Sequence, residues 1–62
     1  MYEVYWGQET ESASTRDEAI RLARQMSSET FNTVVVEDDR DCERLTYRNG
    51  DLIKYSYDTR KG

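Results

Sequence analysis

An acidic segment near the middle of the chain is the first candidate for chemistry. Residues 37–43 carry five acids against one base, and Asp39, Asp41 and Glu43 alternate as the first ligands of a calcium loop do. The EF-hand pattern then requires glycine where Arg44 stands and glutamate where Gly50 stands. We therefore expect no bound metal, and a solvated turn that discourages edge aggregation. The residues of this candidate acidic loop are Asp38, Asp39, Asp41 and Glu43.

The composition excludes most catalytic machinery. The 62 residues include no histidine, and Cys42 is the only cysteine. Neither Ser-His-Asp nor Cys-His catalysis is available without histidine, and a usual zinc site lacks its ligands. The neighbours of Cys42 are Asp41 and Glu43, which disfavour its thiolate. We expect no enzyme activity and no cofactor, since so small a domain also leaves little room for a deep pocket around a carboxylate pair.

Aromatic and basic residues in the C-terminal part suggest nucleic-acid binding as an alternative. From residue 44 onward the chain has five bases and two acids, and RNA-binding sheets set aromatic side chains among basic ones. The whole chain nevertheless carries 13 acids against 9 bases, and its formal net charge of −4 opposes phosphate binding. Two alternatives stay open: single-stranded nucleic-acid binding through the basic hairpin and the tail at Arg60 and Lys61, and an acidic loop that mimics nucleic acid and inhibits a basic partner.

An amphipathic helix is the clearest element that could position these groups. The motif Thr15-Arg16-Asp17-Glu18 has the capping-box form, with threonine at the cap and glutamate three residues later. The spacing predicts a helix over residues 16–27. Its apolar stripe consists of Ala19, Leu22, Ala23 and Met26, with Ile20 on the flank.

The remaining segments favour strands. Residues 2–6 are rich in aromatics and predict a strand, whereas residues 8–14 are small and polar and predict a loop or a frayed edge strand. Residues 31–37 contain a β-branched run and predict a buried strand. Its parity stays open, because either Val35 or the pair Val34 and Val36 points inward.

A β-hairpin is predicted around Asn49-Gly50, with strands over residues 43–48 and 52–58. A two-residue turn would set Leu45 and Tyr47 on the face opposite to the apolar residues of the second strand. A three-residue loop with a bulge pairs Leu45 with Ile53 and places Arg44 opposite Lys54. We prefer this loop because all five apolar side chains then share the core face. The five are Leu45, Tyr47, Ile53, Tyr55 and Tyr57.

These elements predict an α+β two-layer sandwich. The order is β-α-β-β-β, with a mainly antiparallel sheet and one helix packed on one face. Residues 1–62 form a single small domain, with residues 59–62 as a flexible tail. A core this small has marginal stability, and dimerisation is one way to complete it.

The helix start Thr15-Arg16-Asp17-Glu18-Ala19-Ile20, followed by Ala23-Arg24, resembles that of a class of small bacterial domains of unknown function. In that class an aromatic strand precedes a Thr-x-x-Glu-Ala helix, and a β-branched strand and a hairpin follow. Tyr5-Trp6, Val34-Val35-Val36 and Tyr55-Ser56-Tyr57 fall in matching places. The acidic segment 38–43 departs from the pattern. The resemblance implies a fold and no activity.

Together these features favour a non-enzymatic interaction or regulatory module that binds a protein partner or a second copy. A sheet with one helix leaves its other face open, and apolar groups there suit a partner. No signal peptide is evident, and the longest aliphatic run, residues 34–36, is too short for a membrane span, so we expect a cytoplasmic protein. The candidate partner surface consists of Tyr5, Val35, Arg44, Arg48 and Lys54.

Overall fold

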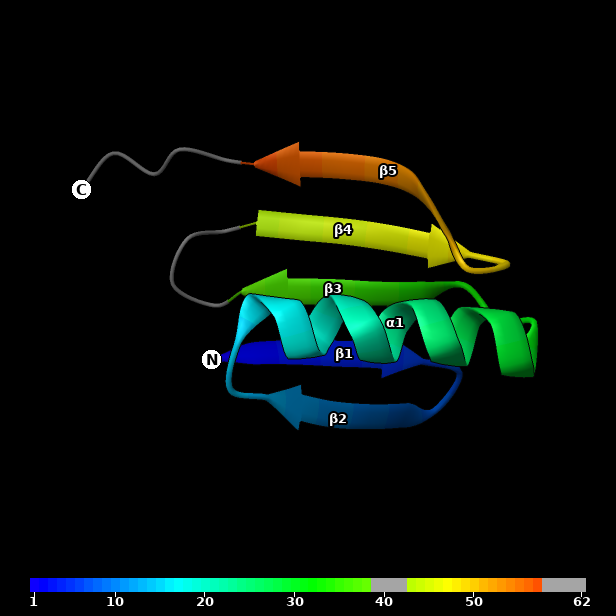
Figure 1. The fold of residues 1–62 in the computed structure, drawn as a ribbon, viewed down its shortest axis with the longest axis horizontal. Helices are drawn as coiled ribbons and strands as arrows, with labels where there is room; N and C mark the ends of the chain where they lie inside the picture. Colours follow the sequence, from blue (N-terminus) through cyan, green and yellow to red (C-terminus); the bar gives the residue numbers. More distant parts are fainter. Residues whose placement is uncertain (39–42, 58–62) are drawn as a thin grey trace.

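A computed structural model shows an α+β fold in which one helix lies across one face of a five-stranded antiparallel sheet (Figure 1). The structure describes residues 1–38 and 43–57. The sheet order is β2-β1-β3-β4-β5, so the predicted fold class is confirmed, with one strand added before the helix. The elements are β1 (Tyr2–Trp6), β2 (Glu9–Ala13), α1 (Arg16–Thr30), β3 (Val34–Asp38), β4 (Glu43–Arg48) and β5 (Asp51–Tyr57).

The added strand is the polar segment for which the sequence allowed either a loop or an edge strand. It pairs antiparallel with β1, from Trp6 opposite Glu9 to Tyr2 opposite Ala13. The connection takes the chain through Gly7, whose φ of +57° lies in the region that favours glycine. An edge strand packs few side chains, and here only Ala13 is buried. Its polar sequence therefore does not prevent it from pairing.

The helix begins where the sequence predicts. Thr15 has extended backbone angles, and its hydroxyl accepts a hydrogen bond of 3.2 Å from the backbone N–H of Glu18. The return half of the capping box differs from expectation. The Glu18 carboxylate accepts from the amide and the hydroxyl of Ser14, at 3.3 and 3.0 Å. The cap therefore extends one residue further back along the chain.

The helix ends later than predicted, at Thr30 rather than at Ser27. The Thr30 hydroxyl donates to the carbonyl of Met26 at 2.7 Å, and Phe31 closes the helix in the left-handed region with a φ of 60°. Ser27 is fully buried within the helix, and its hydroxyl accepts the backbone N–H of Gly50 at 2.9 Å. A serine that suggested the end of the helix is therefore its link to the hairpin.

The core lies between α1 and the three central strands. Val34 and Val36 are fully buried, which settles the parity of β3, and Val35 points to the face away from the helix. Two helical alanines are also completely buried, and small side chains let the helix backbone approach the sheet closely. The buried apolar residues are Val4, Ala13, Ala19, Ala23, Val34, Val36, Leu45 and Tyr47.

The hairpin register differs from the predicted one. Arg48 lies opposite Asp51, so the loop has two residues, and both Asn49 and Gly50 have positive φ, 55° and 82°. Such angles define the tight hairpin turn that asparagine followed by glycine favours. The register then shifts between Thr46 and Tyr47 of β4. The extra residue is Ile53 of β5, which forms a bulge and has no partner in the register.

The predicted three-residue loop is therefore wrong, and so are the pairs that depended on it. Leu45 lies opposite Tyr55 instead of Ile53, and Ser56 instead of Lys54 lies opposite Arg44. The bulge inside β5 corrects the alternation of faces that the short turn alone would have reversed. Tyr55 consequently shares the helix side of the sheet with Leu45.

The expectation that the apolar residues of β5 belong to the core is also wrong. Ile53, Tyr55 and Tyr57 are 56%, 49% and 56% exposed. The reason is the position of α1, which covers β1 and β3 and leaves β5 uncovered at the edge of the sheet (Figure 1). Only the β4 half of the hairpin, with Leu45 and Tyr47, is buried.

Within the described residues, no helix is long and apolar enough to cross a membrane. The single helix described has 15 residues, and its apolar side chains that are buried or packed against the core are Ala19, Ile20, Leu22, Ala23 and Met26. Asp39, Asp41 and Cys42, and the tail predicted for residues 59–62, lie outside the residues that the structure describes.

Candidate functional site

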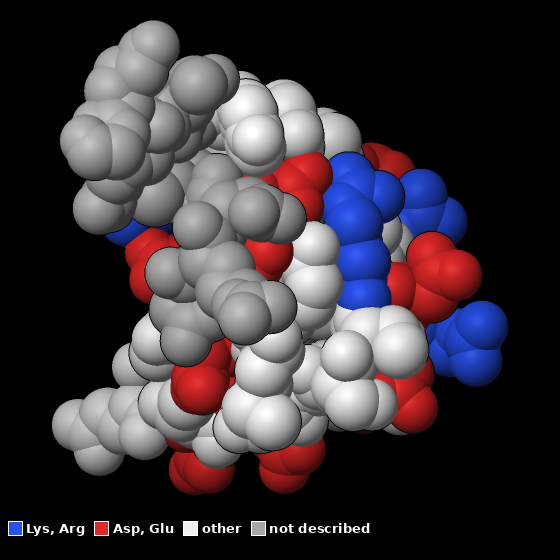
Figure 2. All heavy atoms as spheres, turned by 90° about the vertical axis from the view of Figure 1, so that its left-hand side faces the viewer, with Lys and Arg blue, Asp and Glu red and all other residues white. Residues whose placement is uncertain are grey.

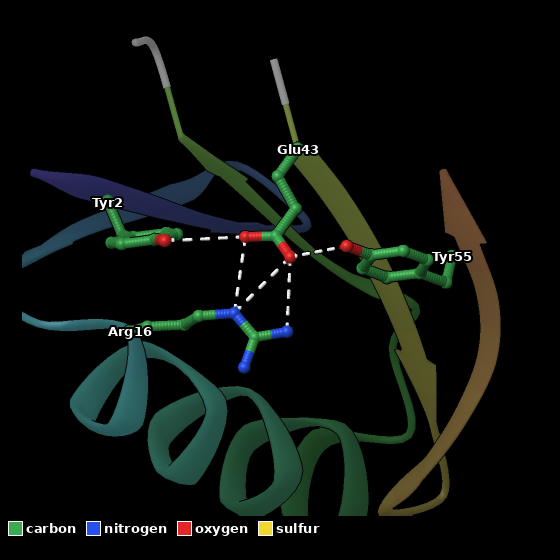
Figure 3. Close-up of polar contacts among 4 residues, drawn as sticks. All are labelled: Tyr2, Arg16, Glu43 and Tyr55. Carbon is green, nitrogen blue, oxygen red and sulfur yellow. Dashed lines mark hydrogen bonds and ion pairs between the residues drawn. The ribbon is translucent and has the colours of Figure 1, made fainter. Parts of the chain in front are cut away.

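A buried carboxylate organises the end of the sheet where β4 begins. Glu43, at the start of β4, is 7% exposed and lies among three side chains from three other elements (Figure 3). Tyr2 reaches it from β1, Arg16 from the first residue of α1, and Tyr55 from β5. We call these four residues the Glu43 cluster.

The hydrogen bonds saturate both oxygens of the carboxylate. The Arg16 guanidinium donates from Nε to both oxygens at 3.2 Å and from Nη2 to Oε2 at 3.1 Å. The Tyr2 hydroxyl donates to Oε1 at 3.3 Å, and the Tyr55 hydroxyl donates to Oε2 at 2.6 Å. Burying a carboxylate is favourable only with such compensation. The described residues contain no buried side-chain polar atom without a hydrogen-bond partner.

The pKa values of the cluster follow from these contacts. The hydrogen bonds from Arg16 lower the pKa of Glu43, against the effect of burial. Burial and the charge of Glu43 raise the pKa of Tyr2 to about 12. The hydrogen bond to Glu43 raises the pKa of Tyr55. Near neutral pH the carboxylate is therefore ionised and both phenols are protonated, which suits a structural clasp better than proton transfer.

The acidic loop differs from the solvated turn that the sequence predicted. Of its four acids, Asp38 and Glu43 lie in strands, directly opposite one another in the register, and are 6% and 7% exposed. Asp39 and Asp41 lie outside the described residues. Among the residues that the structure does describe, no group of three or more acidic or cysteine side chains is placed to hold a metal ion.

The open face of the sheet, opposite the helix, holds all five residues of the predicted partner surface. The register places Tyr5 opposite Val35. The same row of side chains continues across the sheet to Thr46 in β4 and Lys54 in β5. Arg44 and Arg48 share this face because they alternate with the buried residues of β4. The apolar part of this face is small, consisting of one partly exposed tyrosine and one valine.

Charges on the open face are balanced. Arg44 makes an ion pair of 2.6 Å with Glu37, to which it lies opposite in the register. The charged residues of this face are the acids Glu3, Glu37 and Asp51 and the bases Arg44, Arg48 and Lys54. Figure 2 shows acidic and basic side chains mixed on the end of the molecule that lies at the left of Figure 1, outside the grey atoms. Neither surface has the excess of positive charge that nucleic-acid binding requires.

The two edges of the sheet differ from one another. The β2 edge is polar, and its exposed residues are Glu9, Thr10, Glu11 and Ser12. The β5 edge exposes all seven of its residues. Four of these are large and apolar: Leu52, Ile53, Tyr55 and Tyr57, which are between 46% and 56% exposed.

The sequence did not reveal the Glu43 cluster or the exposed edge. The pattern placed Glu43 both in the acidic loop and at the start of a strand, and it placed Tyr55 in the core, because neither the hairpin register nor the position of the helix follows from a pattern. In the sequence, Arg16 stands out only as a residue of the capping motif. The signal available in the sequence was the high density of tyrosine at or near strand ends. A partly buried tyrosine ring needs a polar group that bonds its hydroxyl.

Comparison with known proteins found no match. No family model corresponds to the chain, and neither a curated protein nor a solved structure matches it. A functional proposal therefore rests on the geometry of the fold itself.

Proposed function

We propose that this chain is a non-enzymatic protein-binding module whose binding surface is the outer edge of β5, the last strand of the sheet among the described residues. The single observation that carries this proposal is the exposure of four large apolar side chains on one edge strand. An edge strand presents unpaired backbone N–H and C=O groups, which can take up a further strand. Exposed apolar side chains beside such an edge contribute binding energy when the added strand covers them.

The Glu43 cluster supports this proposal because it fixes part of the binding surface. Tyr55 is half exposed, yet its hydroxyl is held by the buried carboxylate of Glu43 at 2.6 Å. A ring fixed before binding loses less conformational freedom when a partner covers it. The Glu43 cluster thus pre-organises the aromatic surface of β5.

The functions predicted for the open face and for the acidic loop have less support. The open face predicted from the sequence has balanced charges and a small apolar area, so binding there, to protein or to single-stranded nucleic acid, stays a prediction. The nucleic-acid-mimic hypothesis needs exposed acids, and Asp38 and Glu43 are buried. Enzymatic activity finds no support in the Glu43 cluster, whose lowered and raised pKa values oppose proton transfer near neutral pH.

The experiment that tests the proposal is an NMR titration of the labelled chain. The probe is a capped peptide about as long as β5, in which threonine and valine alternate, so that it is neutral and β-forming. We expect shifts in the amides of β5 and in the ring signals of Tyr55 and Tyr57. Shifts confined to the open face around Tyr5, or no shifts at all, would contradict the proposal.

A pair of variants controls for non-specific binding. Tyr57→Lys changes an exposed residue of the β5 edge, and Thr10→Lys makes the same change in charge on the exposed β2 edge. We expect the first to abolish the shifts and the second to leave them in place. Sedimentation velocity on the free chain tests the alternative occupant, a second copy.

A further inference from the structure

From the geometry of β5 we infer that the strand it receives is an acidic one. The partner is an extended peptide that places a carboxylate opposite Lys54 and apolar side chains opposite Tyr55 and Tyr57. This inference rests on the function proposed above and adds the chemistry of the partner to it.

The two sides of β5 differ in character because of the hairpin register. Lys54 lies opposite Thr46, and Ser56 lies opposite Arg44, so both belong to the open face. Tyr55 lies opposite the buried Leu45 and belongs to the helix side, as does Tyr57 opposite Glu43. A strand added to this edge continues the same alternation. Its residues therefore meet a polar row on one side and an aromatic row on the other.

The charged residues of β5 indicate which charge the facing strand should carry. Lys54 is the only charged residue in the middle of β5, since Asp51 lies beside the turn. Within the described part of the chain Lys54 has no ion pair, whereas Arg44 is already paired with Glu37. Opposite charges across neighbouring strands are favourable and like charges are unfavourable. Lys54 therefore favours a strand with an acidic residue at the facing position.

A second copy suits this edge less well. If two copies pair their β5 strands antiparallel about the middle of the strand, the two Lys54 ammonium groups lie opposite or next to one another in the joined sheet. An acidic peptide avoids this pairing of like charges and gains the local attraction of Lys54.

The test uses two capped peptides of the length of β5. In one, glutamate alternates with valine, and in the other lysine replaces glutamate. Titration at low ionic strength, followed by NMR, should show the glutamate peptide binding about fivefold more tightly, as expected when an attractive cross-strand pair replaces a repulsive one. The preference should shrink as salt is added.

The decisive variant is Lys54→Glu, which should reverse the preference. Lys54 is exposed and pairs with Thr46, so its replacement leaves the core intact. Arg21→Glu, at an exposed position of α1, makes the same change in net charge and should leave the preference unchanged.

The outcomes separate the inference from the function on which it rests. If both charged peptides shift β5 equally, or if Lys54→Glu does not alter the preference, the inference is wrong and the proposed function stands. If a second copy occupies the β5 edge in sedimentation and NMR, the acidic partner is wrong as well. If no peptide and no second copy perturbs β5, the proposed function itself fails.

Discussion

Replacing Glu43 by glutamine should destabilise the fold by about 2 kcal/mol at neutral pH. Glutamine keeps the shape of the side chain but removes its charge, and it offers one acceptor oxygen where Arg16, Tyr2 and Tyr55 need two. A hydrogen bond to a charged group contributes about 1.5–3 kcal/mol. The Arg16 side chain is 48% exposed and stays hydrated when its partner is neutral, which places the loss toward the lower part of that range.

The effect should depend on pH in a defined direction. The pKa of Glu43 is lowered in the fold, so the unfolded chain binds this proton more readily. The stabilisation is complete above the ordinary carboxyl pKa and is lost as the pH falls through the lower, folded value. Wild type and Glu43→Gln should therefore differ most near neutral pH and become similar in strong acid, where both side chains are uncharged.

Urea unfolding, followed by the fluorescence of Trp6, the only tryptophan, measures both the loss of stability and its dependence on pH. Thermal unfolding should show a midpoint lower by about 10 °C for a domain of this size. The matched control is Glu37→Gln, which removes the ion pair with Arg44 on the open face and should cost less than about 0.5 kcal/mol. A Glu43→Gln protein as stable as this control, or equally destabilised at every pH, would refute the structural role of the cluster.

Three further predictions concern the core, the hairpin and the cluster. Val36→Ala should lower the free energy of unfolding by about 2 kcal/mol, whereas Val35→Ala on the open face should have a much smaller effect; equal losses in urea unfolding would contradict the assigned parity. Ser27→Ala should cost about 1 kcal/mol and speed hydrogen exchange of the Gly50 amide, which loses its acceptor; unchanged exchange would show that this bond does not anchor the turn. Tyr2→Phe should remove a tyrosine with a pKa of about 12 from the alkaline ultraviolet titration; an unchanged titration would place that pKa elsewhere. Because this pKa is raised in the fold, the stabilisation that Tyr2 provides is present below its ordinary value of 10.0 and is lost as the pH rises toward 12.

The elements that local chemistry determines were predictable from the sequence. Thr15 and Glu18 define the start of α1, because a helix cap needs only residues that are close along the chain. Asn49 and Gly50 define a hairpin for the same reason. The fold class then follows from packing one amphipathic helix on strands that have an apolar face.

Features that depend on register were not predictable. The bulge that leaves Ile53 unpaired cannot be distinguished from a longer turn by pattern alone, because both bring Tyr55 to the side of Leu45. The position of the helix on the sheet decided which apolar residues are buried. With α1 over β1 and β3, the tyrosines of β5 became a surface. The burial and the partners of Glu43 were not predictable, because the partners come from distant segments and a sequence pattern does not contain such contacts.

The pairing of β1 with β3 has a consequence for how the chain reaches its native state. Trp6 lies opposite Val34, although the whole of β2 and α1 separates the two strands along the chain. The two hairpins, β1–β2 and β4–β5, close through short turns, an event that takes microseconds in peptides. Joining them requires a long loop to close around the helix, which is entropically costly. The docking of β3 beside β1 is thus the step expected to limit the folding rate, and substitutions at Val4 or Val36 should slow refolding more than substitutions in β5 do.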